Sequence, residues 1–229
     1  ETNSPHLPVN AHGRIVRFKP DELLLEEGSG STQFGQSFDE WGHHFLVAND
    51  NHIYLEAIAN KYLKRNEEQT LGDATESISD HGQACEVFPI TKNPENQLLT
   101  DVGVTTSTCG ILNYLGGAFP EKFNNNISFE CEPVSNLVHI DRLKDNGASF
   151  TASRILDHKE FLASTDPWFR PVNLYTGPDG ALYVVDYYRE IIEHPEWMSD
   201  SAAKSDKLYN GHDLGRIYRI TATRAAPVT

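Results

Sequence analysis

The chain has 229 residues and a formal charge of −14, because 19 Lys and Arg stand against 33 Asp and Glu. This negative balance argues against a basic groove for nucleic acid and against attraction to anionic lipid. No apolar run approaches the roughly 18 residues that a membrane-spanning helix needs. Three cysteines are too few for a disulfide-built scaffold, and the lack of a CxxCH motif excludes attachment of a c-type haem by that motif.

Most of the chain consists of short apolar or alternating runs between turn signals, which is typical of β-strands. The segment 54–65 differs, because its apolar residues recur at helical spacing and predict a short amphipathic helix. A second short helix is predicted at 191–199, and the GPDG turn at 177–180 indicates a hairpin. The predicted strands, in chain order, are 13–18, 23–27, 33–38, 44–49, 86–90, 106–114, 127–133, 137–143, 150–156, 166–175, 181–188 and 215–220.

Internal repetition indicates the architecture. Two near copies of one strand, GRIVRF at 13–18 and GRIYRI at 215–220, frame three similar groups that start near residues 33, 106 and 170. Each group holds an apolar strand, a turn and a second apolar strand. Such repeats, every ~40–60 residues, favour the blades of a β-propeller over the alternative, a β-sandwich with variable loops.

The sequence therefore predicts an all-β propeller in residues 1–221 and a linker in 222–229. About three blades and a partial one are expected, with short helical insertions. A propeller needs roughly four to eight blades to close. We therefore expect further blades from the same chain or from a companion chain.

Four stretches carry a resemblance to a known family: ISDHG at 78–82, SFECEPVSNLVHID at 128–141, the segment 161–197, and GHDLGRIYRI at 211–220. They are similar to the C-terminal half of the membrane-bound dehydrogenase-like propellers of planctomycetes and verrucomicrobia. Those proteins are related to soluble quinoprotein glucose and sorbosone dehydrogenases. The resemblance implies a six-bladed propeller, exported to the periplasm or cell surface, that oxidises a sugar or alcohol. It also implies pyrroloquinoline quinone and calcium as cofactors.

The hairpin around 177–180 gathers charged and aromatic residues at one rim of the propeller. If its turn is centred between residues 178 and 179, Arg170 lies near Tyr187 and next to a Pro171–Asp186 pair. We expect an anionic cofactor or substrate oxygens at this rim, because arginine offers a rigid fork of donors that suits carboxylates. The alternative is an internal ion pair between Asp186 and an arginine. The predicted cofactor-binding residues are Arg170, Asp186, Tyr188 and Arg189.

Two cysteines are expected to meet in the preceding hairpin. A register that pairs Leu112 with Ser128 also pairs Cys109 with Cys131. A disulfide between them is predicted if the chain is exported, and two reduced core cysteines are the alternative. Cys85 has no predicted partner and is expected to be free.

His81, within Ser79–Gly82, is the predicted catalytic residue. The neighbouring Asp80 can fix the tautomer of its ring, so that it can take a hydroxyl proton as a general base. The alternative is a loop histidine that caps backbone carbonyls. His43, His44 and His52 are interpreted as surface turn residues. The polar run 49–51 has no recognised metal-ligand spacing, so no metal site is predicted.

Three functions remain open from the sequence. The first is a quinone-dependent dehydrogenase that passes electrons to a cytochrome c, whose basic surface the acidic chain would attract. The second is a non-catalytic propeller that binds carbohydrate or protein partners. The third is a structural scaffold whose rim only holds other domains.

Overall fold

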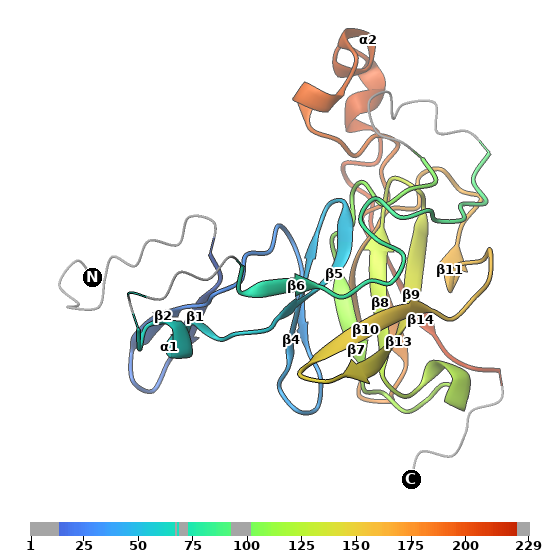
Figure 1. The fold of residues 1–229 in the computed structure, drawn as a ribbon. Coiled ribbons are helices and arrows are strands. Elements are labelled where there is room, and N and C mark those ends of the chain that lie inside the picture. Colours follow the sequence, from blue (N-terminus) through green and yellow to red (C-terminus); the bar gives the residue numbers. More distant parts are fainter. Residues whose placement is uncertain (1–13, 67, 69–72, 93–101, 224–229) are drawn as a thin grey trace.

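Consecutive strands build each sheet, so the chain completes one antiparallel sheet before it starts the next (Figure 1). The computed structural model describes residues 14–66, 68, 73–92 and 102–223. The first sheet holds β3 (Gln36–Phe38), β4 (His44–Ala48), β5 (Asn51–Glu56) and β6 (Thr75–Ser77). The second holds β7 (Ile111–Tyr114), β8 (Ile127–Glu132), β9 (Leu137–Asn146) and β10 (Ser149–Arg154), and the short β11 (Leu162–Ala163) also pairs with β9. The third holds β12 (Pro171–Thr176), β13 (Leu182–Asp186) and β14 (Arg216–Ile220).

Successive sheets contact one another through their first strands. β3 packs against β7, and β7 packs against β12. A glycine precedes the first strand at equivalent places in two sheets: a side chain at Gly35 would collide with the backbone before β7, and one at Gly110 with the backbone of β12. The same close contact therefore repeats from sheet to sheet, as in a propeller. The predicted all-β, propeller-like fold is confirmed, and the total of six blades stays a prediction.

Two apolar layers fill the spaces between the sheets. Phe45, Ile53 and Leu55 of the first sheet meet Ile111 and Leu143 of the second in one layer. The opposite face of the second sheet meets the third sheet in the other layer, which contains Phe129, Ile140, Leu174, Leu182 and Val184. Because both faces of the second sheet are covered in its middle, polar side chains on β8 and the first half of β9 also lie in the interior.

Two smaller parts flank the sheets in Figure 1. The ribbon of β1 (Val16–Lys19) and β2 (Leu24–Glu27) lies to one side with α1 (Asn60–Leu63), and η1 (Glu121–Phe123) follows β7. An insertion between β13 and β14 holds η2 (Pro195–Trp197), α2 (Asp200–Ala203) and η3 (Asp206–Tyr209), and it projects beyond the sheets. None of the helices in the described ranges is both long and apolar enough to cross a membrane.

Several sequence predictions differ from the structure. The predicted helix at 54–65 is mostly wrong, because β5 runs through Glu56 and only α1 is helical. Extension buries Ile53 and Leu55 against the second sheet, and this gain outweighs local helical preference. In place of the strand at 86–90 there is a single bridge between Glu86 and Val104.

The terminal predictions have mixed outcomes. The near copies GRIVRF and GRIYRI lie in different surroundings, since β1 pairs only with β2 whereas β14 is the third strand of the third sheet. Most of the predicted linker at 222–229 lies outside the described residues.

Candidate functional site

The polar centre of the molecule begins with an alternating pattern on two neighbouring strands. β8 and β9 place one set of side chains in the apolar layer toward the third sheet and the other set on the opposite face. That opposite face is polar: Ser128 lies across from Asp141, and Glu130 lies across from His139. All four of these residues are buried. A buried ionisable face of this kind needs partners from the sheet that covers it.

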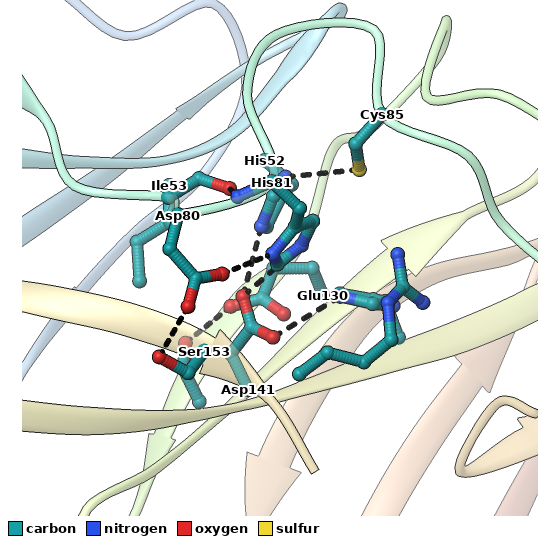
Figure 2. A network of polar contacts seen from close by, with 12 residues as sticks. His52, Ile53, Asp80, His81, Cys85, Glu130, Asp141 and Ser153 are labelled. Atoms are coloured by element: carbon teal, nitrogen blue, oxygen red, sulfur yellow. Dashed lines mark hydrogen bonds and ion pairs between the residues drawn. The ribbon is translucent and has the colours of Figure 1, made fainter. Parts of the chain in front are cut away.

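His52 and His81 supply those partners. His52 lies on β5, and His81 lies in the loop after β6, which a bridge between Ser79 and Ala152 holds against β10. Both rings approach Asp141: His52 Nε2 lies 2.9 Å and His81 Nε2 lies 3.6 Å from its Oδ2 atom (Figure 2). His139 Nε2 lies 3.3 Å from Oδ1 of the same carboxylate. We call His52, His81, His139 and Asp141 the histidine–aspartate centre.

The outer nitrogen of each ring is held by a second group. His81 Nδ1 lies 2.9 Å from Asp80, whose other oxygen accepts a hydrogen bond from Ser153 Oγ (Figure 2). His139 Nδ1 lies 2.7 Å from Glu160. His52 Nδ1 lies 3.7 Å from the Cys85 thiol. All three rings are thus fixed from behind, with Nε2 directed toward Asp141.

Several atoms at the middle of the centre have no hydrogen-bond partner among the described residues. They are His81 Nε2, His139 Nε2 and Asp141 Oδ1, together with the neighbouring Glu130 Oε2. Unpaired buried polar atoms cost ~1–3 kcal/mol each, and native proteins contain few of them. Such a concentration at one point indicates that the centre accommodates another polar group.

The electrostatics of the centre are strongly perturbed. Burial lowers the pKa of His52 to about 4. Burial also favours the neutral ring of His139, but the Asp141 and Glu160 carboxylates outweigh it and raise the pKa of His139 well above its usual range. Burial raises the pKa of Glu130 to about 8, and the adjacent charge of Asp141 adds to the effect. These shifts favour the charged form of His139 beside Asp141 and the neutral forms of His52 and Glu130.

The structure brings only one of the sequence-predicted site residues, His81, into this centre. Its contact with Asp80 was expected from their adjacency and is present. The interpretation of His52 and His44 as surface residues is wrong: His52 is fully buried, and His44 is buried against Glu56. His139 and Asp141 were missed as site residues. Their signal was the period of two in SFECE and VHID, where polar residues alternate with apolar ones inside strands that are buried on both faces.

Arg170 lies elsewhere, at the start of β12, and it is fully used by the backbone. The predicted hairpin register is confirmed at this end, where Pro171 pairs with Asp186 and Tyr187 N–H donates to Arg170 O. The Arg170 guanidinium donates to the carbonyls of Pro133, Arg189 and Glu190, at 2.8–3.2 Å. Burial lowers its pKa to about 10. Its role in the structure is to connect three loops.

Asp186 and Arg189 are occupied in the same way. Asp186 accepts hydrogen bonds from the N–H groups of Arg170 and Tyr188, and it pairs with Arg216 at 2.8 Å. The alternative of an internal ion pair between Asp186 and an arginine is thus present. Arg189 donates to carbonyls that include those of His212 and Leu214, which ties the insertion to β13. Tyr188 has a positive φ of 51° and lies under the Arg216 guanidinium. The charged groups of Arg170, Asp186 and Arg189 therefore do not fit a carboxylate-bearing quinone, because they already have partners within the fold.

The predicted disulfide is not formed. Ile111 pairs with Glu130 and Asn113 with Ser128, so the register differs by one residue from the predicted one. Cys109 N–H donates to Cys131 O, whereas Cys131 N–H donates to Gly110 O, which places two residues opposite Cys131. All three cysteines, each within the described ranges, are free thiols, and Cys131 packs in the apolar layer. The alternative of reduced core cysteines describes them.

Comparison with known proteins assigns the chain to a protein family. Residues 3–224 match the model of a domain of unknown function, DUF7133. No curated protein matches the chain significantly in sequence. Among solved structures, the chain is similar to a candidate oxidoreductase (glucose dehydrogenase) from Thermus thermophilus, with a TM-score of 0.37 and 16% identity over 85% of this chain and 45% of that one. The chain thus spans less than half the length of the Thermus protein. By its family match, this chain belongs to the DUF7133 family.

Proposed function

We propose that the chain is part of a dehydrogenase-like propeller that oxidises a hydroxyl group of a sugar or alcohol, bound at the histidine–aspartate centre. The observation that carries the proposal is the group of unpaired polar atoms on His81, His139 and Asp141. A hydroxyl group can both donate to a carboxylate oxygen and accept from an imidazole N–H, so it suits this mixture of atoms.

The direction of approach follows from burial. The His81 side chain is 17% exposed, whereas those of His52, His139 and Asp141 are at most 1% exposed. A substrate would therefore reach the centre from the side of the His81 loop. This keeps His81 as the substrate-facing residue of the proposed reaction.

The sequence resemblance supports the same place in the molecule. Two of the four stretches that resemble dehydrogenase propellers, ISDHG and SFECEPVSNLVHID, contain His81, His139 and Asp141. The first stretch lies in the loop after β6 and the second on β8 and β9, so they meet only through folding. The part of the chain that resembles dehydrogenases thus coincides with the polar centre.

The proposal assigns no redox cofactor to Arg170, Asp186, Tyr188 or Arg189, because the three charged groups have partners within the fold and Arg216 lies over the Tyr188 ring. Pyrroloquinoline quinone with calcium stays the cofactor that the resemblance implies. A basic cytochrome c stays the proposed electron acceptor, since a charge of −14 would speed its encounter. The proposed location is the periplasm or cell surface.

A dye-linked assay of the intact protein tests the reaction. Sugars and alcohols are offered with added pyrroloquinoline quinone, calcium and dichlorophenolindophenol, a two-electron dye. The substrate becomes a carbonyl compound by losing two electrons and two protons, which the dye accepts as it is bleached. We expect substrate-dependent bleaching that Asp141→Asn lowers roughly 100-fold in kcat/KM. The exposed His194→Gln is the matched control and should change kcat/KM less than about twofold.

The same assay can also refute the dehydrogenase proposal. If no sugar or alcohol bleaches the dye with saturating quinone, while calorimetry still detects sugar binding, the dehydrogenase proposal fails. The non-catalytic, carbohydrate-binding propeller then becomes the better description.

A further inference from the structure

We propose that His52, His81, His139 and Asp141 bind a divalent transition-metal ion. The four side chains offer one ligand atom each, and these atoms all lie within 4.8 Å of one another. They come from β5, the loop after β6, and β9, so the site forms where the first two sheets meet. The inference concerns the centre described above, but metal binding can be measured without any turnover.

The distances around Asp141 suit a small four-coordinate ion. A tetrahedral zinc ion with bonds of about 2.0–2.1 Å holds its ligand atoms roughly 3.3–3.4 Å apart. The three imidazole Nε2 atoms lie 2.9, 3.6 and 3.3 Å from the nearest Asp141 oxygen. The four ligand atoms lie up to 4.8 Å apart, so side-chain movements that bring the rings closer together would complete a coordination shell.

The groups behind the ligands point to the same use. A metal-bound imidazole usually donates its second N–H to a carboxylate or carbonyl, which fixes the ring. Asp80 holds His81 in this way and Glu160 holds His139, each through Nδ1. This arrangement leaves Nε2 of both rings without a hydrogen-bond partner among the described residues, and a metal ion would coordinate both atoms.

The donor set also selects the class of metal. Three nitrogens and one carboxylate oxygen favour Zn²⁺ and related first-row ions, whereas Ca²⁺ and Mg²⁺ prefer sets of oxygens. The Cys85 thiol lies behind His52 and outside the ligand set. Asp141 would offset part of the ion's charge directly, and Asp80 and Glu160 would do so from behind the rings. The calcium ion that the sequence resemblance implies is therefore a poor match for this site.

A metal-free ion network is the competing explanation, and the two differ most at His81. Such a network accounts for His139, which lies between Asp141 and Glu160, and for His52, which contacts Asp141. It gives His81 Nε2 no hydrogen-bond partner, although this atom is buried and lies 3.6 Å from the Asp141 carboxylate. A metal ion explains the positions of all three rings.

Titration of the intact protein, stripped with a chelator, decides between them. ZnCl₂ is added in a calorimeter, and CoCl₂ is added in parallel to read the visible bands of tetrahedral Co²⁺. We expect one ion per chain. His81→Gln should weaken binding roughly 100-fold or more, and Asp80→Asn about 10- to 100-fold, because Asp80 fixes the His81 ring. His194→Gln, which changes an exposed histidine, should leave binding unchanged.

Two results would overturn the inference: no stoichiometric binding of Zn²⁺ or Co²⁺ by the stripped wild type, or equal binding by wild type and His81→Gln. His81 is the most exposed of the four ligands, so this variant is the one expected to fold, and circular dichroism verifies that it does. Tight metal binding without alcohol oxidation would support the metal site and refute the dehydrogenase proposal. Full oxidation activity in stripped protein that also binds no added ion would support the dehydrogenase proposal and refute the metal site.

Discussion

The region around Arg170 and the histidine–aspartate centre are both buried and polar, but they differ in whether their polar atoms have hydrogen-bond partners. Around Arg170, each nitrogen of the guanidinium donates to a backbone carbonyl, and Asp186 has Arg216 and two N–H groups. In the histidine–aspartate centre, three atoms that face one another have no hydrogen-bond partner in the described part of the chain. Burial and charge alone do not distinguish the two regions.

The contrast separates a structural role from a ligand-binding one. The Arg170 region connects β12, the β8–β9 turn and the segment after β13, so removing it should loosen the fold. The histidine–aspartate centre costs folding free energy unless something binds there. Stability measurements without ligand should therefore give a large loss for a change at Arg170 and a small one for a change at His81.

The largest expected effect is that of Arg170→Met. This change removes the three hydrogen bonds that the buried guanidinium donates to the carbonyls of Pro133, Arg189 and Glu190. We expect the free energy of unfolding to fall by about 3–5 kcal/mol, measured by urea denaturation. The same substitution at the half-buried Arg142, which donates to two carbonyls nearer solvent, is the control and should cost less than about 1.5 kcal/mol. Equal losses would refute a special role for Arg170.

A second prediction concerns Glu56 and His44, a histidine–carboxylate pair outside the centre in which both groups have hydrogen-bond partners. The hydrogen bond from His44 at 2.6 Å, together with those from Ser29, lowers the pKa of Glu56 from 4.5 to about 2. Because the pKa is lower in the folded state, the stabilisation is fully present above pH 4.5 and is lost as the pH falls toward 2. Glu56→Gln should thus cost ~1–3 kcal/mol at neutral pH.

The pH series is the measurement for this prediction. The difference in unfolding free energy between wild type and Glu56→Gln should be constant from neutral pH down to about pH 5 and should close below it. Glu76→Gln, an exposed change on the neighbouring strand β6, should show no such closing. A gap that widens in acid would show that the paired carboxylate does not stabilise the fold.

Sequence reasoning placed the hairpin at 177–180 correctly, because its turn signal is local. Counting from the turn also gave the pairing of Pro171 with Asp186, but from Asn173 to Thr176 the register differs by one residue, and an irregularity between Pro171 and Asn173 absorbs the difference. Counting failed for β7 and β8 as well, because a long connection with η1 and an irregular pairing at Gly110 separate them. A shift of one residue sends each side chain to the other face. Cys109 and Cys131 still lie beside each other, joined by a backbone hydrogen bond, but their thiols form no disulfide.

The candidate site shows the same limit. Asp80 and His81 are adjacent, and their contact could be predicted. His52 and Asp141 are separated by 89 positions, so their contact exists only because the first two sheets pack together. The helical spacing after Tyr54 also directed attention away from the strand that carries His52. The centre forms by the packing of two sheets, so no local sequence pattern predicts its contacts.

The smallest expected effect belongs to His81→Gln in metal-free protein, and it sharpens the contrast with Arg170 most. His81 Nε2 has no hydrogen bond to lose. The hydrogen bond between its Nδ1 and Asp80 lies in a partly exposed loop. We expect a loss of less than about 1 kcal/mol in urea denaturation, because only one exposed hydrogen bond is removed. Added Zn²⁺ should then raise the midpoint of wild type and not that of the variant, since an ion stabilises only the form that binds it. A large loss without metal would instead mean that His81 is a structural residue like Arg170, and that the unpaired nitrogen does not identify a ligand site.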